Sequence, residues 1–311
     1  MLFGNRNRSR MVDSMYYNQL PSSIRVQLEA LKSLDRYTKK HIEEVPIYAY
    51  KICRQLGIHG QRLDFIMTAA YLHDVGKIFI PPRVLQKQGK LTDEEFDIMK
   101  SHSAKGYELC MSLEDIRPYA STVRGHHESL DGSGYPDRLV GSQISYETRI
   151  IKVADVYSAL SSKRQYKEAF STKQIIEIMY KDVDNHKMDS EIVYALLRVV
   201  TKEKIQELYD LKRNIRVYKK QLKYTRNVYE LLQYYAQMKL NSYEVMELIK
   251  NNRELYNIID INLEDIKDAN DLYNKLNVNI KQLETKVNSY DSIKNEIKEL
   301  EEYSKKVMDK M

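Results

Sequence analysis

The chain has 311 residues, of which 30% are charged and 42% hydrophobic, and its formal net charge is +6. No stretch reaches the about 18 consecutive apolar residues of a membrane-spanning helix, and the basic start lacks the apolar centre of a secretory signal, so we expect a cytoplasmic protein with no membrane span. The mild positive charge suits an anionic substrate, but it is not the concentrated basic surface of a protein that binds duplex nucleic acid.

Glycine and proline divide the chain into two parts. All ten glycines and all six prolines lie at or before Gly141, and residues 142–311 contain neither. A stretch of that length rich in Leu, Ile, Lys, Glu and Tyr predicts helices, and no segment shows the apolar/polar alternation of a sheet. We therefore predict an all-α protein with a disordered or short leader over residues 1–21, a compact helical domain over 22–201 and a helical region over 202–311.

The first two expected helices bring three candidate ligands into the compact domain. Thr38 is the expected cap of a helix that presents His41 beside its apolar face. A second helix from about Arg62 ends at the adjacent pair His73 and Asp74. Its expected buried residues are Phe65, Ile66, Ala69 and Leu72. Adjacent side chains on a helix diverge by about 100°, but both members of the pair can still reach one metal centre.

Two later helices carry further candidates. Thr92 and Glu95 form the pattern of a capping box that begins a helix containing His102. Residues 146–160 predict an apolar helix with Asp155 inside it. A lone carboxylate in such a run costs on the order of several kcal/mol to bury unless it is paired or bound to a metal.

The candidate ligands together indicate a metal site. Any one histidine alone reads as an ordinary core or surface residue, but five of the seven histidines fall, with two aspartates, at helical or loop positions of the first part. Mixed histidine and carboxylate ligation fits Fe, Mn or Zn better than Mg or Ca. The candidates are His41, His73, Asp74, His102, His126, His127 and Asp155.

The second part has heptad spacing without candidate chemistry. Apolar residues follow steps of three and four from Leu208 to Leu232 and again from Leu276 to Tyr290, which predicts a coiled coil or a helical hairpin. Polar residues at 241–242 and 251–252 are the expected turns. A homodimer, a protein partner and an intramolecular bundle all fit the same pattern.

Three motifs carry a resemblance to a known family. In order they are HDVGK from His73, HHESLDGSGYP from His126, and RIIKVADVYSA from Arg149. Over about residues 22–200 the chain resembles the HD-GYP domain, a branch of the HD metal-dependent phosphohydrolases. The resemblance implies an HD-type catalytic domain that hydrolyses cyclic di-GMP to linear pGpG in bacterial second-messenger signalling, with onward hydrolysis to GMP left open.

The resemblance also implies a role for each matched residue. One metal would be held by His41, His73, Asp74 and Asp155, and a second by Asp74, His102 and His126, with His127 as a further ligand or a support. The two divalent ions would be iron or manganese. Catalysis would use Asp74 and Lys77, and the substrate would be bound by Gly134, Tyr135, Pro136, Arg164 and Lys167.

Two positions depart from the family pattern. Tyr37 stands where some members have a glutamate for a third metal, so we expect two metals and the linear dinucleotide as product. Ser158 stands where aspartate is common and removes a charge near the metals. Ser158 and the helical tail motivate one alternative, a weakly active or inactive nucleotide-binding scaffold. A second alternative is an HD hydrolase acting on another nucleotide, such as a linear or hybrid cyclic dinucleotide.

Overall fold

The computed structural model describes residues 16–18, 20–34, 36–162, 170–237, 244, 247 and 266–311. In these ranges there is no β-strand, only one isolated β-bridge between Asp131 and Val140, and the all-α prediction is confirmed. Arg164, Lys167 and the turns expected at 241–242 and 251–252 lie outside the described residues.

No helix in the described part of the chain is both long enough and apolar enough to cross a lipid bilayer.

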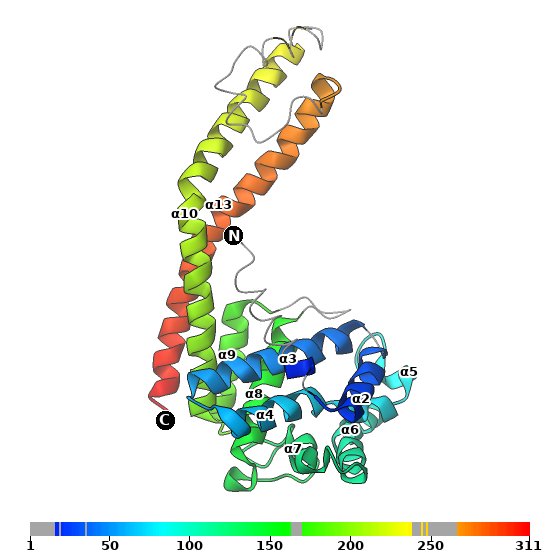
Figure 1. Cartoon of the computed structure of the whole chain (residues 1–311). Helices are drawn as coiled ribbons and strands as arrows, with labels where there is room; N and C mark the ends of the chain where they lie inside the picture. The colour runs from blue at the N-terminus through cyan, green and yellow to red at the C-terminus, as the bar shows by residue number, and fades with distance from the viewer. Residues whose placement is uncertain are drawn as a thin grey trace. The chain divides into compact units, whose positions relative to one another are not determined.

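The described residues form two compact units. The first contains the chain up to Lys202 together with Glu299–Met311, and the second is Glu203–Lys298. The helices of the first unit (Figure 1) are α2 (Ser22–Lys32), α3 (Arg36–Gln55), α4 (Gly60–Leu72), η1 (Val75–Phe79), α5 (Pro82–Leu85), α6 (Asp93–Ser112), η2 (Arg117–Tyr119), α7 (Ala120–Gly125), η3 (Gly141–Gln143), α8 (Tyr146–Ser161) and α9 (Thr172–Asp184). Two long helices, α10 (Ser190–Gln237) and α13 (Ala269–Met308), have residues in both units.

Helix α3 packs against both α4 and α8 in the core of the first unit. Its buried residues recur at the spacing of one helix face, namely Ile42, Val45, Ala49 and Ile52. Helix α3 begins at Arg36, so the prediction that Thr38 caps it is wrong. Thr38 lies one turn before Ile42 and is itself buried, so packing on this face keeps it within the helix. In α4, the expected core residue Phe65 is only partly buried, and its ring lies 5.0 Å from that of Tyr119.

The first unit extends beyond the expected compact domain at both ends. Leu20 is buried in it, and the ring of Tyr17 lies 5.9 Å from that of Tyr71; the disordered or short leader over residues 1–21 stays a prediction. At the other end, Leu300 and Val307 belong to the same core cluster. The last turns of α13 are therefore part of the first unit, whereas the sequence placed all of 202–311 in a separate region.

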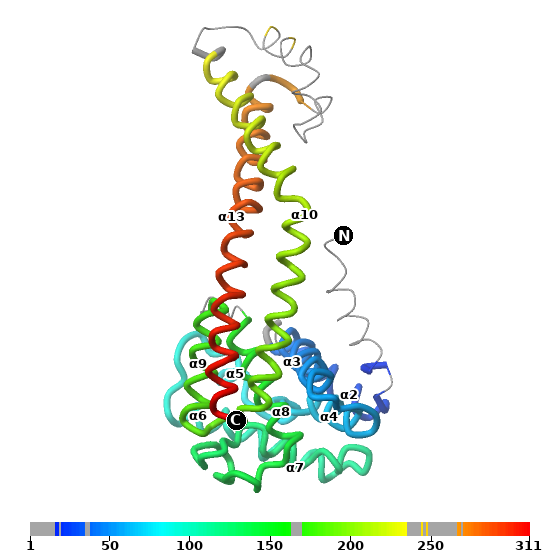
Figure 2. Tube along the Cα trace, turned by 90° about the vertical axis from the view of Figure 1, so that its left-hand side faces the viewer, coloured from blue at the N-terminus to red at the C-terminus, as the bar shows by residue number. Residues whose placement is uncertain are grey.

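The second unit is an antiparallel pair of helices. Residues 203–237 of α10 and the part of α13 up to Lys298 run side by side in opposite directions (Figure 2). The Tyr229 and Tyr273 rings stack at 4.5 Å. The buried residues between the helices are Val228, Leu232, Leu272, Leu276, Ile280 and Leu283. The heptad pattern thus forms a helical hairpin, one of the two predicted arrangements.

Candidate metal centre

The seven candidate ligands come from five elements and converge in the first unit. His41 lies on α3, His102 on α6 and Asp155 on α8, and the others follow the ends of α4 and α7. They form two groups in which all ligand atoms lie within 4.8 Å of one another. One group is His41, His73 and Asp155, and the other is Asp74, His102, His126 and His127. The residues scattered over more than 110 positions are therefore brought together as expected.

A glycine allows two of the contributing elements to meet. The backbone at Gly76 approaches α6 so closely that a Cβ atom there would lie 1.9 Å from the carbonyl oxygen of His102. Any side chain larger than hydrogen would push η1 away from α6. Since Asp74 immediately precedes η1, this approach places its carboxylate beside His102.

Asp74 lies between the two groups and faces both. Its Oδ1 is 3.3 Å from Nε2 of His102 and 3.9 Å from Nε2 of His126. Its Oδ2 is 3.3 Å from Nε2 of His73 and 3.7 Å from Nε2 of His41. The carboxylate is 1% exposed, so each oxygen is committed to one side of the cluster. This is the arrangement of a carboxylate that can join two cations.

Three histidine rings are oriented by their own backbones. In each, Nδ1 lies 2.7 Å from the carbonyl oxygen three residues earlier: His73 with Ala70, His102 with Met99 and His126 with Val123. A carbonyl oxygen only accepts, so Nδ1 carries the proton and donates it. When such a ring is neutral, its Nε2 atom presents a lone pair to the cluster, which is how metal-binding histidines are commonly fixed.

The facing lone pairs fit a cation. Nε2 of His102 lies 3.3 Å from Nε2 of His126 and 3.2 Å from Nε2 of His127. Nε2 of His73 is fully buried and makes no hydrogen bond. A buried nitrogen without a partner is costly, and facing lone pairs repel. A divalent metal coordinated by these nitrogens and by Asp74 removes both penalties, and this mixed donor set suits a transition metal.

Burial and charge set the ionisation of the cluster. Burial lowers the pKa of His102 to about 4 and that of His126 to about 3. Burial alone would raise the pKa of Asp74, but the charges of Lys77 and His73 outweigh it and hold the pKa well below its ordinary value. At neutral pH Asp74 is therefore a carboxylate and His102 and His126 are neutral imidazoles, the forms that bind metal.

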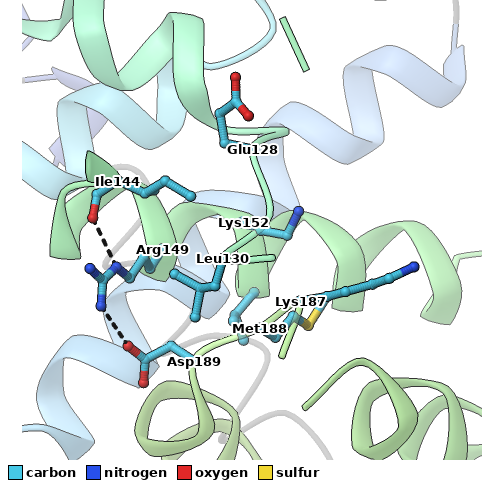
Figure 3. Close-up of a pocket in the computed structure, with 9 residues that line it drawn as sticks. Glu128, Leu130, Ile144, Arg149, Lys152, Lys187, Met188 and Asp189 are labelled. Atoms are coloured by element: carbon cyan, nitrogen blue, oxygen red, sulfur yellow. Dashed lines mark hydrogen bonds and ion pairs between the residues drawn. The ribbon is translucent and has the colours of Figure 1, made fainter. Parts of the chain in front are cut away.

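Glu128 anchors the loop that follows His127 beside the candidate ligands through hydrogen bonds. This carboxylate is fully buried and accepts hydrogen bonds from the backbone N–H groups of Asp137, Arg138 and Leu139, at 2.6, 3.1 and 3.0 Å. Its neighbours include Lys152, whose Nζ donates to Ser129 Oγ at 3.0 Å. Glu128 and Lys152 both line the small pocket of Figure 3, which includes none of the seven candidate ligands.

The same loop places the predicted substrate-binding tyrosine on the cluster. The ring of Tyr135 stacks on that of His127 with centroids 4.7 Å apart and planes inclined by 28°. The backbone at Gly134 packs directly against the first residues of the same loop. A Cβ atom at this position would lie only 2.4 Å from the backbone nitrogen of Ser129. Pro136 follows through a cis peptide bond. Burial, with Asp155 and Asp74, raises the pKa of Tyr135, so its hydroxyl keeps its proton.

We expect Glu128→Gln to loosen this loop. An amide in place of the carboxylate loses a charge-assisted acceptor for three backbone donors and turns an N–H group toward them, so the free energy of unfolding should fall by about 1–3 kcal/mol. Urea unfolding measures the loss, and hydrogen exchange at residues 137–139 locates it. The control is Asp131→Asn, which changes an exposed carboxylate of the same loop. Equal losses in the two variants would contradict the assignment.

Comparison with known proteins gives consistent matches to the first unit. A family model described as HD domain matches residues 17–192. Over 171 residues, 54% of the chain, it is 42% identical to the cyclic di-GMP phosphodiesterase response regulator RpfG of Xanthomonas campestris and covers 45% of that protein. It is 36% identical to the 3'3'-cGAMP-specific phosphodiesterase 2 of Vibrio cholerae, of which it covers 32%, again over 54% of the chain. A cyclic di-GMP phosphodiesterase of Thermotoga maritima is 35% identical over 58% of the chain and 50% of its own length. The chain thus spans half or less of these relatives.

Proposed function

The chain belongs to the HD-domain family, and from that premise we propose that it is a metal-dependent phosphodiesterase that hydrolyses cyclic di-GMP to linear pGpG. The resemblance to the HD-GYP branch, noted in its motifs, is confirmed by the family match and by the relatives RpfG and the Thermotoga maritima phosphodiesterase. The observation that carries the proposal is the position of Asp74, with one oxygen toward each of two histidine-rich groups.

The donor set supports two divalent cations, iron or manganese. We assign His41, His73 and Asp155 to one, His102, His126 and His127 to the other, and Asp74 to both. When bound, such paired cations lower the pKa of a water molecule toward neutrality and offset the charge on phosphoryl oxygens. Attack of a water oxygen on phosphorus would break the bond to the 3′-oxygen, which takes up a proton. This leaves a 5′-phosphate and a free 3′-hydroxyl, and one such step opens the ring.

Residues around the cluster have supporting roles in this proposal. Lys77 Nζ lies 2.5 Å from Asp74 Oδ2, so its positive charge stands at the edge of the centre, where it stabilises the Asp74 carboxylate and an incoming phosphate. Tyr135, protonated and stacked on His127, can donate a hydrogen bond to an anionic ligand or pack against a base. Gly134 and Pro136 shape the loop around it. Roles for Arg164 and Lys167 in binding phosphate or guanine stay predictions.

The relatives point to one particular alternative substrate. Matches include proteins named for cyclic di-GMP and proteins named for 3'3'-cGAMP, and the two nucleotides share one guanosine half. We therefore propose a cyclic dinucleotide that contains guanine as the substrate class, with cyclic di-GMP as the substrate and 3'3'-cGAMP as its competitor.

The test is hydrolysis by the purified full chain. We expect conversion of cyclic di-GMP to pGpG with Mn(II) or Fe(II), loss of conversion after chelation, and recovery when metal is returned, all followed by chromatographic separation of the nucleotides. Parallel reactions with 3'3'-cGAMP and with linear pGpG rank the substrates. Saturable binding of cyclic di-GMP without turnover in either metal would instead support a nucleotide-binding scaffold.

The helical hairpin is not assigned a catalytic part. Its exposed apolar residues, which include Tyr209, Val217 and Val278, are available to a protein partner or to a second copy of the chain. We propose that such a partner binds to this hairpin.

A further inference from the structure

His41 is oriented by a neighbouring helix, in contrast to His73, His102 and His126. Its Nδ1 lies 3.0 Å from the hydroxyl oxygen of Ser158 on α8. Ser158 is fully buried, and its hydroxyl also donates to Oε2 of Glu44 at 3.2 Å. Glu44 lies on α3, three residues after His41. A chain of contacts therefore runs from a carboxylate through a hydroxyl to the imidazole.

The chemistry of these groups fixes the direction of each hydrogen bond. A carboxylate only accepts, and a serine hydroxyl has a single proton. When Nε2 of His41 coordinates a cation, Nδ1 carries the ring proton and donates it to the Ser158 oxygen, whose own proton goes to Glu44. The other ring nitrogen, Nε2, faces the cluster at 2.9 Å from Asp155 and 3.7 Å from Asp74. A cation bound there would take the place of the proton that Nε2 shares with Asp155.

Glu44 is itself held in place for this contact. Ser162 Oγ donates to the same oxygen, Oε2, at 2.6 Å, and Lys40 Nζ lies 3.3 Å from Oε1. Ser162 is buried. The negative charge of Glu44 therefore acts on His41 through Ser158 from a fixed position, and a carboxylate partner makes a histidine a better metal ligand.

We propose that Glu44 and Ser158 are positioning residues that orient His41 and strengthen cation binding at the group of His41, His73 and Asp155. The inference rests on the proposed function, because it needs a metal at that group. The inference also bears on Ser158, which stands where aspartate is common in the family. The carboxylate that α8 lacks at this position is supplied by Glu44 of α3, which acts on His41 through the Ser158 hydroxyl.

The test is Mn(II) binding to the metal-free full chain, measured by titration calorimetry without nucleotide. Ser158→Ala should weaken binding at the affected site by about 10–100-fold. Glu44→Gln should weaken it by about tenfold in the wild-type background and have no further effect in the Ser158→Ala background. The matched control is Ser161→Ala on the same helix, whose hydroxyl bonds the Ser158 carbonyl. It should leave affinity within about twofold.

A relocated carboxylate provides the rescue. Ser158→Asp combined with Glu44→Gln moves the charge directly beside His41 and should bring Mn(II) affinity back to within a few-fold of wild type, whereas Ser158→Asp alone sets two carboxylates together and should bind less well. If Glu44→Gln weakens Mn(II) binding equally in the wild-type and Ser158→Ala backgrounds, Glu44 does not act through Ser158 and the proposal is wrong. If Ser158→Ala does not fold, an unchanged affinity in Glu44→Gln overturns it. A wild-type chain that binds no Mn(II) refutes the proposed metal centre itself.

Discussion

Asparagine in place of Asp74 should abolish metal binding and hydrolysis of cyclic di-GMP together. The two carboxylate oxygens of Asp74 face different groups of histidines, and an amide offers only one acceptor oxygen and no charge. Loss of the shared ligand removes several kcal/mol of transition-state stabilisation, so kcat should fall by on the order of 10³. Metal content by elemental analysis and turnover by chromatography measure the two effects on the same preparation.

Asp97→Asn is the matched control for this prediction. Asp97 is an exposed aspartate on α6 that pairs with Lys100, so the same chemical change there should leave both metal content and rate at the wild-type level. Thermal unfolding of each variant checks that the chain is folded. A variant at Asp74 that keeps two metals and the wild-type rate would refute the catalytic assignment.

The helices were predictable because the local sequence signals, such as capping residues and apolar periodicity, agree with tertiary packing over most of the chain. The capping box of Thr92 and Glu95 is present at the start of α6, and the helix around Asp155 runs from Tyr146 to Ser161. At Thr38 the two conflict. A threonine before an apolar helix favours a cap, but burial of its side chain places it inside α3, and only tertiary packing reveals that.

The candidate ligands were predictable as a set, and their supports were not. Any one histidine alone looked ordinary, so His41, His102 and Asp155 were predicted from their concentration with the other candidates and from the family motifs, and their roles as metal ligands stay predictions. Glu44 acts through a serine 114 positions away, and Glu128 binds backbone groups nine to eleven positions later. Neither contact follows a helical or strand period, so no pattern in the sequence marks it.

Lowering the pH from about 6.5 to about 4 should destabilise the metal-free protein. In the unfolded chain histidines have a pKa of about 6.5, whereas burial lowers the pKa of His102 to about 4 and of His126 to about 3 in the fold. Between these values the unfolded state binds more protons, so this stability is complete above about pH 6.5 and is lost as the pH falls. The two shifts together correspond to on the order of several kcal/mol.

His73 opposes the trend, because the charges of Asp74 and Asp155 outweigh its burial and raise its pKa. The lowered pKa values of His102, His126 and His127 outweigh this one increase. Urea unfolding at several pH values between 7 and 4 gives the slope of the free energy of unfolding against pH.

The double variant His102→Gln and His126→Gln should flatten this slope, while His59→Gln, at an exposed histidine, should not. Saturating Mn(II) should steepen the slope, because protons compete with the cation for the same nitrogens. If neither the double variant nor the metal changes this slope, burial does not hold His102 and His126 neutral. The cluster would then lack the neutral imidazoles that bind a cation.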